Sequence, residues 1–306
     1  MSSLEVRNLS KSFGDLKAVD NASFTVPEGS IFGLLGRNGA GKTTTIRMMM
    51  NIIMPDSGEV NFKGIKAGPD FNSKVGYLPE ERGLYKKMKV IDTLLFFAEI
   101  KGKKGKAITK LAKDYLKRFD LLDRMNSKIE DLSKGNQQKV QFITTLLHDP
   151  EVLILDELFS GLDPINTNLM KDIILELKNE GKIILFSTHV MEFAEKMCDH
   201  IAIIDHGKIK LNGSMSDIKA ERSQLNISLN YEGDISFLSG HPIIESISDY
   251  GNSVGIKVRN EKDIQTLLKL LVDRNVVVKK FDANDISLEE IFIDLVGSED
   301  AEVSHV

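Results

Sequence analysis

The stretch GRNGAGKT, residues 36–43, directly follows the apolar run Ile31–Leu35 and leads into a segment of helical composition, Thr43–Asn51. It has the form G-x-x-x-x-G-K-[ST] between a strand and a helix, which is typical of a phosphate-binding loop. Its glycines allow backbone N–H groups to converge on phosphate oxygens at the positive end of the helix. The predicted binding residues are Gly36, Arg37, Asn38, Gly39, Ala40, Gly41, Lys42, Thr43 and Thr44.

Two side chains of this loop have specific tasks in the pattern. The Lys42 amine reaches the β- and γ-phosphates of a bound nucleotide, and the Thr43 hydroxyl is a ligand for Mg²⁺. The order of the glycines differs from the dinucleotide fingerprint G-x-G-x-x-G. The sequence therefore disfavours NAD and FAD.

A second apolar run, Val152–Leu155, ends in two adjacent carboxylates, Asp156 and Glu157. An aspartate at the C-terminal end of a strand can hold Mg²⁺ and its water. Glu157 can then polarise the attacking water. Two acids after a strand are by themselves typical of a solvated strand end, but after a phosphate-binding loop a catalytic role is favoured.

A third apolar run, Ile183–Phe186, is followed by Ser187, Thr188 and His189. Ligands of open α/β sheets bind at the carboxyl ends of the strands. We therefore expect His189 to hydrogen-bond the terminal phosphate. The other histidines are interpreted as structural: His148, His200, His206, His241 and His305.

Apolar strand-like runs alternate with helical stretches over the first two thirds of the chain. Ile201–Ile204 is a fourth run, and Asn166–Asn179 has helical spacing. This alternation predicts an α/β domain whose parallel sheet is covered on both faces. We place that domain at residues 1–220, with a mainly helical part at about residues 84–148.

The last 86 residues, 221–306, are predicted to form a small α+β domain. They hold 8 basic and 16 acidic residues, within a chain of net charge −5. Ser287 and Glu290 form a capping-box pair that begins a last helix, which we expect to end at Gly297. This acidic domain contains no catalytic motif.

A dense group of lysines lies in the helical part of the first domain. The favoured interpretation is a solvated helix face and loop. The alternative is contact with anionic lipid headgroups or with an acidic partner. The group consists of Lys101, Lys103, Lys104, Lys106, Lys110 and Lys113.

Composition excludes several classes of protein. No apolar run approaches the ~18–20 residues needed to span a bilayer, and charges stand where a signal peptide would need an apolar stretch. The single cysteine, Cys198, excludes an internal disulfide. Neither domain is basic enough to indicate nucleic acid as the main ligand. These features predict a cytosolic chain of two domains.

The motifs together resemble the nucleotide-binding subunit of ABC transporters, over residues 4–218. Leu132–Gln138 (LSKGNQQ) resembles the family's LSGGQ signature, Ser160–Asp163 resembles its D-loop, and Tyr77–Glu80 stands at its Q-loop. Phe13 stands where an aromatic ring stacks on adenine. The resemblance implies a P-loop NTPase fold with a mixed sheet core and a helical subdomain, and hydrolysis of ATP with Mg²⁺.

The resemblance also implies a mechanism. Two such subunits, either two copies or two homologues, pack head to tail around two ATP molecules. Ser133 and Gly135 of one subunit then face the phosphate-binding loop of the other, with Asp163 in the adjoining D-loop. Integral membrane permease subunits carry the cargo, so the chain would lie in the cytoplasm on the inner face of the cell membrane.

The sequence YLPEERGLY and the added C-terminal domain resemble the bacterial type associated with sodium efflux and export of drugs or other small molecules. No substrate-binding protein is expected for that type. Ser133 and Gly135 are intact, so we expect activity, with Thr43, Glu80 and Asp156 as the Mg²⁺ ligands. Four positions depart from the family pattern: Glu80 for Gln, Lys134 for Gly, Asn136 for Gln and Leu158 for Pro.

Two other functions compete with that of an export ATPase. One is a soluble ABC-type ATPase that acts on ribosomes or nucleic acid, which usually carries two nucleotide-binding units or a long coiled coil. The other makes the acidic C-terminal domain a regulatory or ligand-sensing module with an ATPase attached. The single phosphate-binding loop favours the export subunit.

Overall fold

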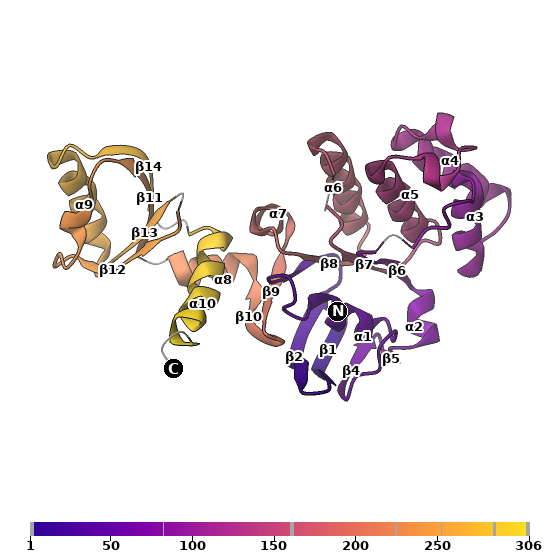
Figure 1. The fold of residues 1–306 in the computed structure, drawn as a ribbon, viewed down its shortest axis with the longest axis horizontal. Helices are drawn as coiled ribbons and strands as arrows, with labels where there is room; N and C mark the ends of the chain where they lie inside the picture. The colour runs from indigo at the N-terminus through magenta and orange to yellow at the C-terminus, as the bar shows by residue number, and fades with distance from the viewer. Residues whose placement is uncertain are drawn as a thin grey trace. The chain divides into compact units, whose positions relative to one another are not determined.

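The structure is a computed structural model, and it describes residues 3–303 except 82, 160, 161, 224, 252, 284 and 285. It consists of two compact units, whose elements are labelled in Figure 1. The first comprises the chain up to Val190 together with Met197–Asn212. The second comprises Met191–Lys196 together with the chain from Gly213 onward. Among the described residues, no helix is both long enough and apolar enough to cross a membrane.

A six-stranded sheet lies at the centre of the first unit (Figure 1). Strands β3 (Ile31–Leu35), β7 (Val152–Asp156) and β8 (Ile183–Thr188) are buried along their whole length. Strands β8 and β9 pair in parallel with β3, β7 pairs in parallel with β8, and β6 with β7, so the carboxyl ends of these five strands share one edge. The order is β10-β9-β3-β8-β7-β6, with β6 at Val75–Leu78, β9 at His200–Asp205 and β10 at Lys208–Ser214.

A second sheet of the first unit is antiparallel, in the order β2-β1-β4-β5. The alternation of the sequence predicts only short strands near Leu4–Arg7 and Ala22–Val26, but the strands extend well beyond them. The polar ends still pair through their backbones, which hydropathy does not show. The bounds are Ser3–Phe13 for β1, Leu16–Pro27 for β2, Ser57–Phe62 for β4 and Ile65–Lys66 for β5.

Both sheets contribute to one core. The ring of Phe24 from β2 stacks on that of Phe32 from β3, with centroids 5.1 Å apart. Helix α1 (Lys42–Met49) buries Ile46 and Met49 in the same core. This packing fixes the loop before α1 against the two sheets.

Helices α3 to α5 form the helical subdomain, which Figure 1 shows beyond β6. The rings of Phe119 and Phe142 meet edge to face in its core, with centroids 6.1 Å apart. Two single-turn helices, Leu122–Arg124 and Ile129–Asp131, join α4 to α5. The bounds of the helices that follow α1 in the first unit are Pro69–Ser73 for α2, Val90–Ile100 for α3, Lys106–Arg118 for α4, Lys134–Leu146 for α5 and Pro164–Asn179 for α6.

The second unit is an antiparallel sheet in the order β12-β13-β11-β14, with α9 packed on one face. The core contains Ile227 and Leu229 of β11 and Leu267 and Leu271 of α9. The elements are α8 at Met215–Ser223, β11 at Asn226–Glu232, a turn of helix at Ser236–Leu238, β12 at Ile244–Asp249, β13 at Val254–Val258, α9 at Glu261–Asp273, β14 at Val277–Ala283 and α10 at Leu288–Val303.

Two details of this unit differ from the sequence analysis. The last helix, α10, does not end at Gly297 but continues to Val303, because the residues after the glycine are ordinary helix formers. Strand β12 was not predicted, because it is an edge strand whose one central apolar side chain, Ile247, faces solvent. The predicted capping box is confirmed: Ser287 and Glu290 exchange both hydrogen bonds.

The short helix α7, Met191–Met197, belongs largely to the second unit. The Glu195 carboxylate accepts the backbone N–H of Leu288 at the start of α10, at 3.0 Å. It also pairs with the Lys219 amine of α8, at 2.5 Å. A helix that begins two residues after His189 is thereby held by C-terminal elements.

Candidate functional site

The loop at residues 36–43 needs glycine at two positions for lack of space. A Cβ atom on Gly36 would lie 2.3 Å from the carbonyl oxygen of Ile204. A Cβ atom on Gly41 would lie 2.6 Å from the carbonyl oxygen of Ala18, and Gly41 also has a φ of 110°, in the left-handed region. The backbone is therefore packed against β2 and β9, which leaves its outer side open to a ligand.

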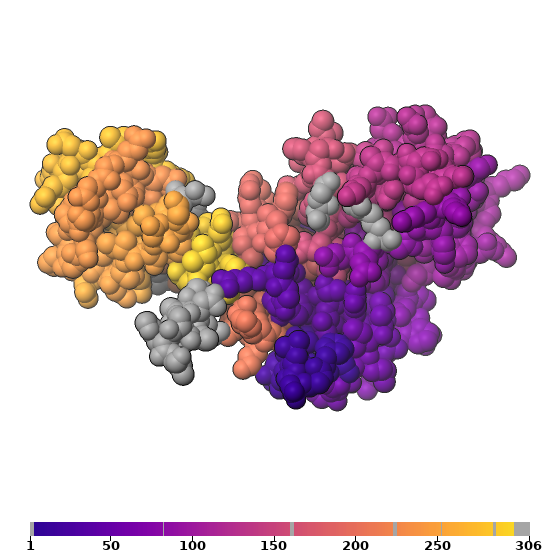
Figure 2. All heavy atoms as spheres, viewed as in Figure 1, coloured from indigo at the N-terminus to yellow at the C-terminus, as the bar shows by residue number. Residues whose placement is uncertain are grey.

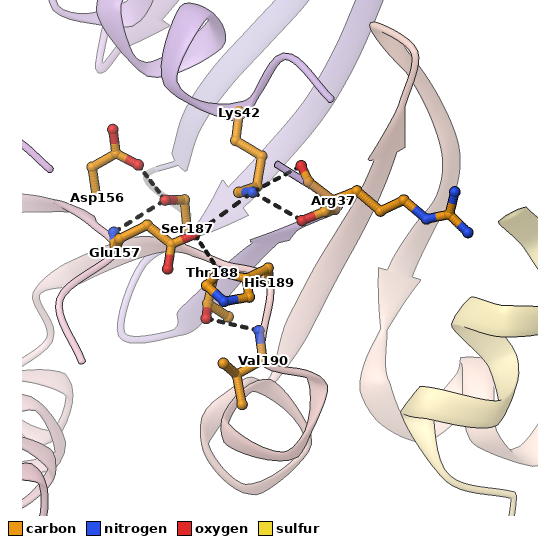
Figure 3. Close-up of polar contacts among 9 residues, drawn as sticks. Arg37, Lys42, Asp156, Glu157, Ser187, Thr188, His189 and Val190 are labelled. Atoms are coloured by element: carbon orange, nitrogen blue, oxygen red, sulfur yellow. Dashed lines mark hydrogen bonds and ion pairs between the residues drawn. The ribbon is translucent and has the colours of Figure 1, made fainter. Parts of the chain in front are cut away.

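Lys42 is held over this loop by the loop itself (Figure 3). Its side chain is only 6% exposed. The amine donates to the carbonyl oxygens of Gly36, at 2.9 Å, and Arg37, at 3.1 Å, and lies 3.6 Å from Oε1 of Glu157. The loop thus holds the Lys42 amine at the position where the phosphates of a nucleotide would bind.

Asp156 ends β7 and is fully buried. The Ser187 hydroxyl of β8 donates to its Oδ1. Its Oδ2 has no hydrogen-bond partner among the described residues. Burial raises the pKa of Asp156, against the hydrogen bond from Ser187, and nearby Glu80 adds to the rise. A buried carboxylate oxygen without a partner is costly unless something positive binds it.

Glu157 follows with a φ of 52°, in the left-handed region. Such a conformation costs about 1–3 kcal/mol in a residue other than glycine and is concentrated at functional sites. Its backbone N–H donates to Ser187, and its Oε1 lies 3.0 Å from Nδ1 of His189. The carboxylate therefore lies between Lys42 and His189, as Figure 3 shows.

A pocket of about 410 Å³ opens over the loop. Phe13, 48% exposed at the end of β1, lies at its wall together with Leu16, and Glu80 lies at another side. The pocket brings together most of the predicted nucleotide residues. Its lining is Phe13, Leu16, Lys17, Ala18, Asn38, Gly39, Gly41, Lys42, Thr43, Thr44, Glu80, Glu157, His206 and Gly207.

Several predicted site residues do not line this pocket. Among them are Gly36, Arg37, Ala40, Asp156 and His189, which neighbour its lining residues in the sequence or contact them, and Ser133, Gly135 and Asp163 on α5 and α6. Ser133 is the N-cap of α5, where its hydroxyl accepts the N–H of Asn136, and Gly135 lies in the first turn of that helix. Asp163 is the N-cap of α6 and accepts the N–H of Asn166 at 2.9 Å. Two residues of the predicted D-loop, Ser160 and Gly161, lie outside the described residues.

The structure adds residues that the sequence analysis did not assign to the site. Ser187 holds both Asp156 and Glu157, and the signal for it is a polar side chain at the end of a buried strand. His206 and Gly207 line the pocket, although His206 was interpreted as structural. No periodicity marks this turn, whose Gly207 N–H donates to the Ala40 carbonyl oxygen at 2.9 Å.

Helix α5 connects several of these elements. The side-chain amide of Gln138 donates to the carbonyl oxygen of Leu158, at 3.1 Å, just after Glu157. The amide of Gln141 donates to the carbonyl oxygen of Glu81, also at 3.1 Å, just after Glu80. One helix therefore carries the LSKGNQQ segment at its start and holds the backbone just after Glu157 and just after Glu80 along its length.

Comparison with known proteins shows what this site belongs to. The sequence profile of the ABC transporter family matches residues 19–160, and that of the C-terminal domain of DrrA1-3-like ATP-binding proteins matches residues 213–296. The ABC transporter ATP-binding protein YhaQ of Bacillus subtilis (strain 168) is 42% identical over 295 residues, 96% of this chain and 99% of that protein. The chain belongs to the ABC transporter ATP-binding proteins.

Other relatives of this ABC ATPase agree with that assignment. NatA of Bacillus subtilis (strain 168) is 36% identical over 221 residues, 71% of this chain and 89% of NatA. The fluoroquinolones export ATP-binding protein MT2762 of Mycobacterium tuberculosis (strain CDC 1551 / Oshkosh) is 31% identical over 283 residues, 92% of this chain and 88% of that protein.

Solved structures share the cassette fold of this ABC ATPase. An ATP-binding subunit of an ABC transporter superposes with a TM-score of 0.68 at 32% identity, over 71% of this chain and 92% of that one. A dimeric cassette in a post-hydrolysis state with ADP and phosphate gives 0.64 at 22% identity, over 69% and 98%. The predicted ABC-type P-loop NTPase with an added C-terminal domain is confirmed, and with it nucleotide binding and ATP hydrolysis that powers transport.

Proposed function

We propose that this chain is the ATP-hydrolysing subunit of an exporter of small solutes or ions, acting through separate membrane subunits, and that its catalytic centre lies at the ends of β7 and β8. The observation that carries the proposal is the arrangement around Asp156. One buried oxygen has no partner, the next residue is held in a strained conformation, and the stored amine of Lys42 is within 3.6 Å of Glu157. A buried oxygen without a donor and a strained backbone both cost folding free energy, and binding of a nucleotide and its metal ion would make use of them.

The residues present fit a Mg²⁺ ion. Its preferred ligands are oxygens, and the site offers the Thr43 hydroxyl, the unpartnered Oδ2 of Asp156 and the carboxylate of Glu80. When bound, Mg²⁺ supplies neutralisation of phosphate charge. The described residues contain no group of three or more His, Cys, Asp or Glu that would hold a metal without the nucleotide.

The chain's own groups divide the remaining work. The amine of Lys42 exchanges its two carbonyl partners for phosphate oxygens, and backbone N–H groups of the loop bind the rest of the phosphate chain. Phe13 stacks on the adenine. Glu157 accepts a hydrogen bond from the attacking water, and His189, held by Glu157, donates to the terminal phosphate.

A second subunit completes each site in this proposal. Ser133 is exposed at the start of α5 and lies outside the pocket of its own chain. The N-terminus of α5 would offer its N–H groups, with Gly135 and the nearby Asp163, to the phosphates bound by the partner. The dimeric form of the solved cassette supports this arrangement, and either a second copy or a homologous subunit fits it.

The permease is proposed to dock on a groove of about 130 Å³ between the central sheet and the helical subdomain. Ile100, 61% exposed, lines the groove with Phe97, and the Tyr85 and Phe96 rings stand beside it 5.5 Å apart. Gln141 lines the groove, and its side-chain amide donates to the carbonyl oxygen of Glu81. A displacement of the groove by the permease would therefore be transmitted to the neighbouring Glu80. We place the subunit in the cytoplasm on the inner face of the cell membrane, with no substrate-binding protein and no nucleic acid as partners.

The catalytic assignment is tested by Glu157→Gln. An amide cannot take a proton from water, so turnover should fall by about 10²–10⁴-fold. Binding of a fluorescent ATP analogue should persist, and saturating ATP should give a stable dimer on a sizing column. The control is Glu180→Gln, which changes an exposed glutamate at the end of α6. Turnover near that of the wild type, or a monomer under saturating ATP, contradicts the proposal.

The docking groove is tested by Ile100→Asp. A charge in an apolar seat should abolish co-purification with the membrane subunits from detergent extracts, identified by mass, while ATP hydrolysis by the isolated chain is retained. Val272→Asp is the matched control, because Val272 is also 61% exposed but belongs to the second unit. Equal co-purification of both variants would reject the groove as the seat.

A further inference from the structure

The helical subdomain carries a charge that nucleotide binding does not explain. Residues 84–148 contain 15 lysines and arginines against 7 aspartates and glutamates, in a chain of net charge −5. Such a concentration of like charge raises the electrostatic cost of folding the subdomain, and an anionic surface beside it would offset that cost. Figure 2 shows this part of the chain, in purple and magenta, as an outer surface of the first unit.

Helix α4 arranges four of these lysines in a stripe. Lys106, Lys110, Lys113 and Lys117 are spaced by four, three and four residues, which places them on one side of a helix. All four are exposed, whereas Ala112 and Leu116, which lie on another side of the helix, are buried. Like charges at these spacings repel along the helix.

The stripe continues into the turn before α4 through Lys103 and Lys104, which are also exposed. Among the described residues, no carboxylate forms an ion pair with any of these six lysines, which we call the α4 basic stripe. Arg118 of the same helix behaves differently, because it pairs with Glu176 at 2.5 Å. The stripe therefore presents unneutralised charge to solvent.

Lys101, which the sequence analysis grouped with these lysines, has another role. Its amine donates to the carbonyl oxygens of Asn72, at 2.5 Å, and Val75, at 3.2 Å. Burial lowers the pKa of Lys101. Lys101 therefore has a structural role, and the lysines that are exposed to solvent begin at Lys103.

The neighbouring surface is apolar and aromatic. Ile100 is exposed three residues before Lys103, and Phe96 and Tyr85 are exposed beside it. Lysines next to exposed aromatic and aliphatic side chains are the composition of surfaces that rest on a membrane interface. An acidic protein partner would need carboxylates spaced to match the stripe, whereas a leaflet of anionic lipid supplies negative charge over any such length.

We propose that the α4 basic stripe binds the anionic headgroups of the cytoplasmic leaflet, beside the permease seat. The position relative to the membrane rests on the proposed function, but the attraction to anionic lipid does not. Each lysine near an anionic membrane surface strengthens binding by about fivefold. The stripe thus adds a lipid anchor to the protein contact at the groove.

The test is co-sedimentation of the full chain with vesicles that contain no permease. Vesicles of phosphatidylcholine mixed with phosphatidylglycerol should retain the protein, and vesicles of phosphatidylcholine alone should not. Raising the salt from about 0.15 M to about 1 M should release it. Replacing Lys106, Lys110, Lys113 and Lys117 by Gln should weaken binding by at least about 100-fold, with circular dichroism and basal ATP hydrolysis unchanged.

The matched control makes the same charge change in the second unit, at the exposed Lys262, Lys269, Lys279 and Lys280. It should weaken binding by less than about fivefold. Equal binding to both vesicle types, or equal loss in both variants, overturns the proposal. Displacement by inorganic phosphate at constant ionic strength, or equally tight binding of a DNA duplex, also overturns it. Loss of vesicle binding leaves the Glu157 result untouched, so the two proposals fail separately.

Discussion

Two buried carboxylates, one in each unit, have opposite hydrogen-bonding states. Asp156 is fully buried with one oxygen bound and the other without a partner. Glu290 is 3% exposed, and both of its oxygens are used. Its Oε1 accepts from the hydroxyls of Ser228 and Ser253, each at 2.9 Å, and its Oε2 accepts from the N–H of Ser287 at 2.9 Å.

The difference distinguishes a carboxylate with an open binding position from a helix-capping carboxylate whose hydrogen bonds are all made within the fold. Three neutral donors around Glu290 stabilise its charge and tie α10 to the sheet, which serves the fold of the second unit. Asp156 is compensated on one oxygen only, and in the proposed function a bound cation compensates the other. The acidic C-terminal unit therefore buries its charge for structure, and the ATP-binding unit buries it for chemistry.

The strongest test of this contrast is Asp156→Asn. The amide removes a metal-binding charge, so turnover at saturating ATP and Mg²⁺ should fall by at least about 100-fold, since a bound metal supplies several kcal/mol of charge stabilisation. In the absence of Mg²⁺ the free energy of unfolding should stay within about 1 kcal/mol of the wild type or rise, because a poorly compensated buried charge is lost. Phosphate release and urea titration measure the two, with the exposed Asp172→Asn as control. A stable variant with normal turnover would break the comparison.

Glu290→Ala should give the reverse pattern. Three donors lose their acceptor, so the free energy of unfolding of the second unit should fall by about 3 kcal/mol. The rate of ATP hydrolysis should stay within about twofold of the wild-type rate, because Glu290 lies in the second unit, away from the proposed catalytic residues. Glu289→Ala is the matched control, because Glu289 is the exposed neighbour in the same helical turn. A large loss of hydrolysis in a folded Glu290→Ala protein would show that the second unit also serves the chemistry.

His148 sharpens the comparison, because it also has a buried unpartnered atom, Nδ1, but no catalytic neighbour. Its Nε2 lies 3.0 Å from the carbonyl oxygen of Val75. Burial, with repulsion from Lys101, lowers the pKa of His148 to about 4. The neutral ring needs no donor at Nδ1, whereas a protonated ring would bury an N–H without an acceptor.

The expected result follows from the sign of that shift. Below pH ~6.5 the unfolded chain binds a proton that the folded chain does not, so stability falls as the pH falls from ~6.5 towards 4. Between pH 7 and pH 5 the free energy of unfolding should drop by about 2 kcal/mol through this residue. His148→Gln, which keeps a donor for Val75, should reduce the pH dependence by that amount in urea titrations. An unchanged slope would contradict it.

The smallest effect is expected for Glu80→Gln. Glu80 is exposed, and its charge acts on Asp156 through solvent, so its removal should change turnover by less than about tenfold. The Mg²⁺ concentration that gives half-maximal turnover should also change only slightly in this variant. Complete loss of turnover, measured by phosphate release, would show that the acid is required.

The phosphate loop and the buried strands could be predicted because each is specified locally. A glycine pattern and an unbroken apolar run depend on few distant contacts. The sequence therefore predicted the loop Gly36–Thr43 and the strands β3, β7 and β8. Ser187 was not, because its importance depends on two residues brought beside it by parallel pairing of β7 and β8. The turn at His206 and Gly207 enters the pocket for a similar reason.

The second unit was less readable for a different reason. Its edge strand β12 carries polar residues on both faces, so hydropathy gives no period. The lysine group shows what the sequence can predict and what only the fold reveals. Its spacing was visible in the sequence, but only the fold separates Lys101, whose amine is bound by carbonyl oxygens, from the lysines that remain free.

The placement of α7 has a consequence for how the second unit can be removed. The chain passes from one unit to the other three times, first after Val190, then after Lys196 and finally after Asn212. A protein cut after Asn212 keeps α7 but loses the Leu288 N–H and the Lys219 amine that hold Glu195. Such a truncation does not simply subtract a domain from a finished ATPase, because it removes the two contacts of Glu195 from a helix that begins two residues after His189.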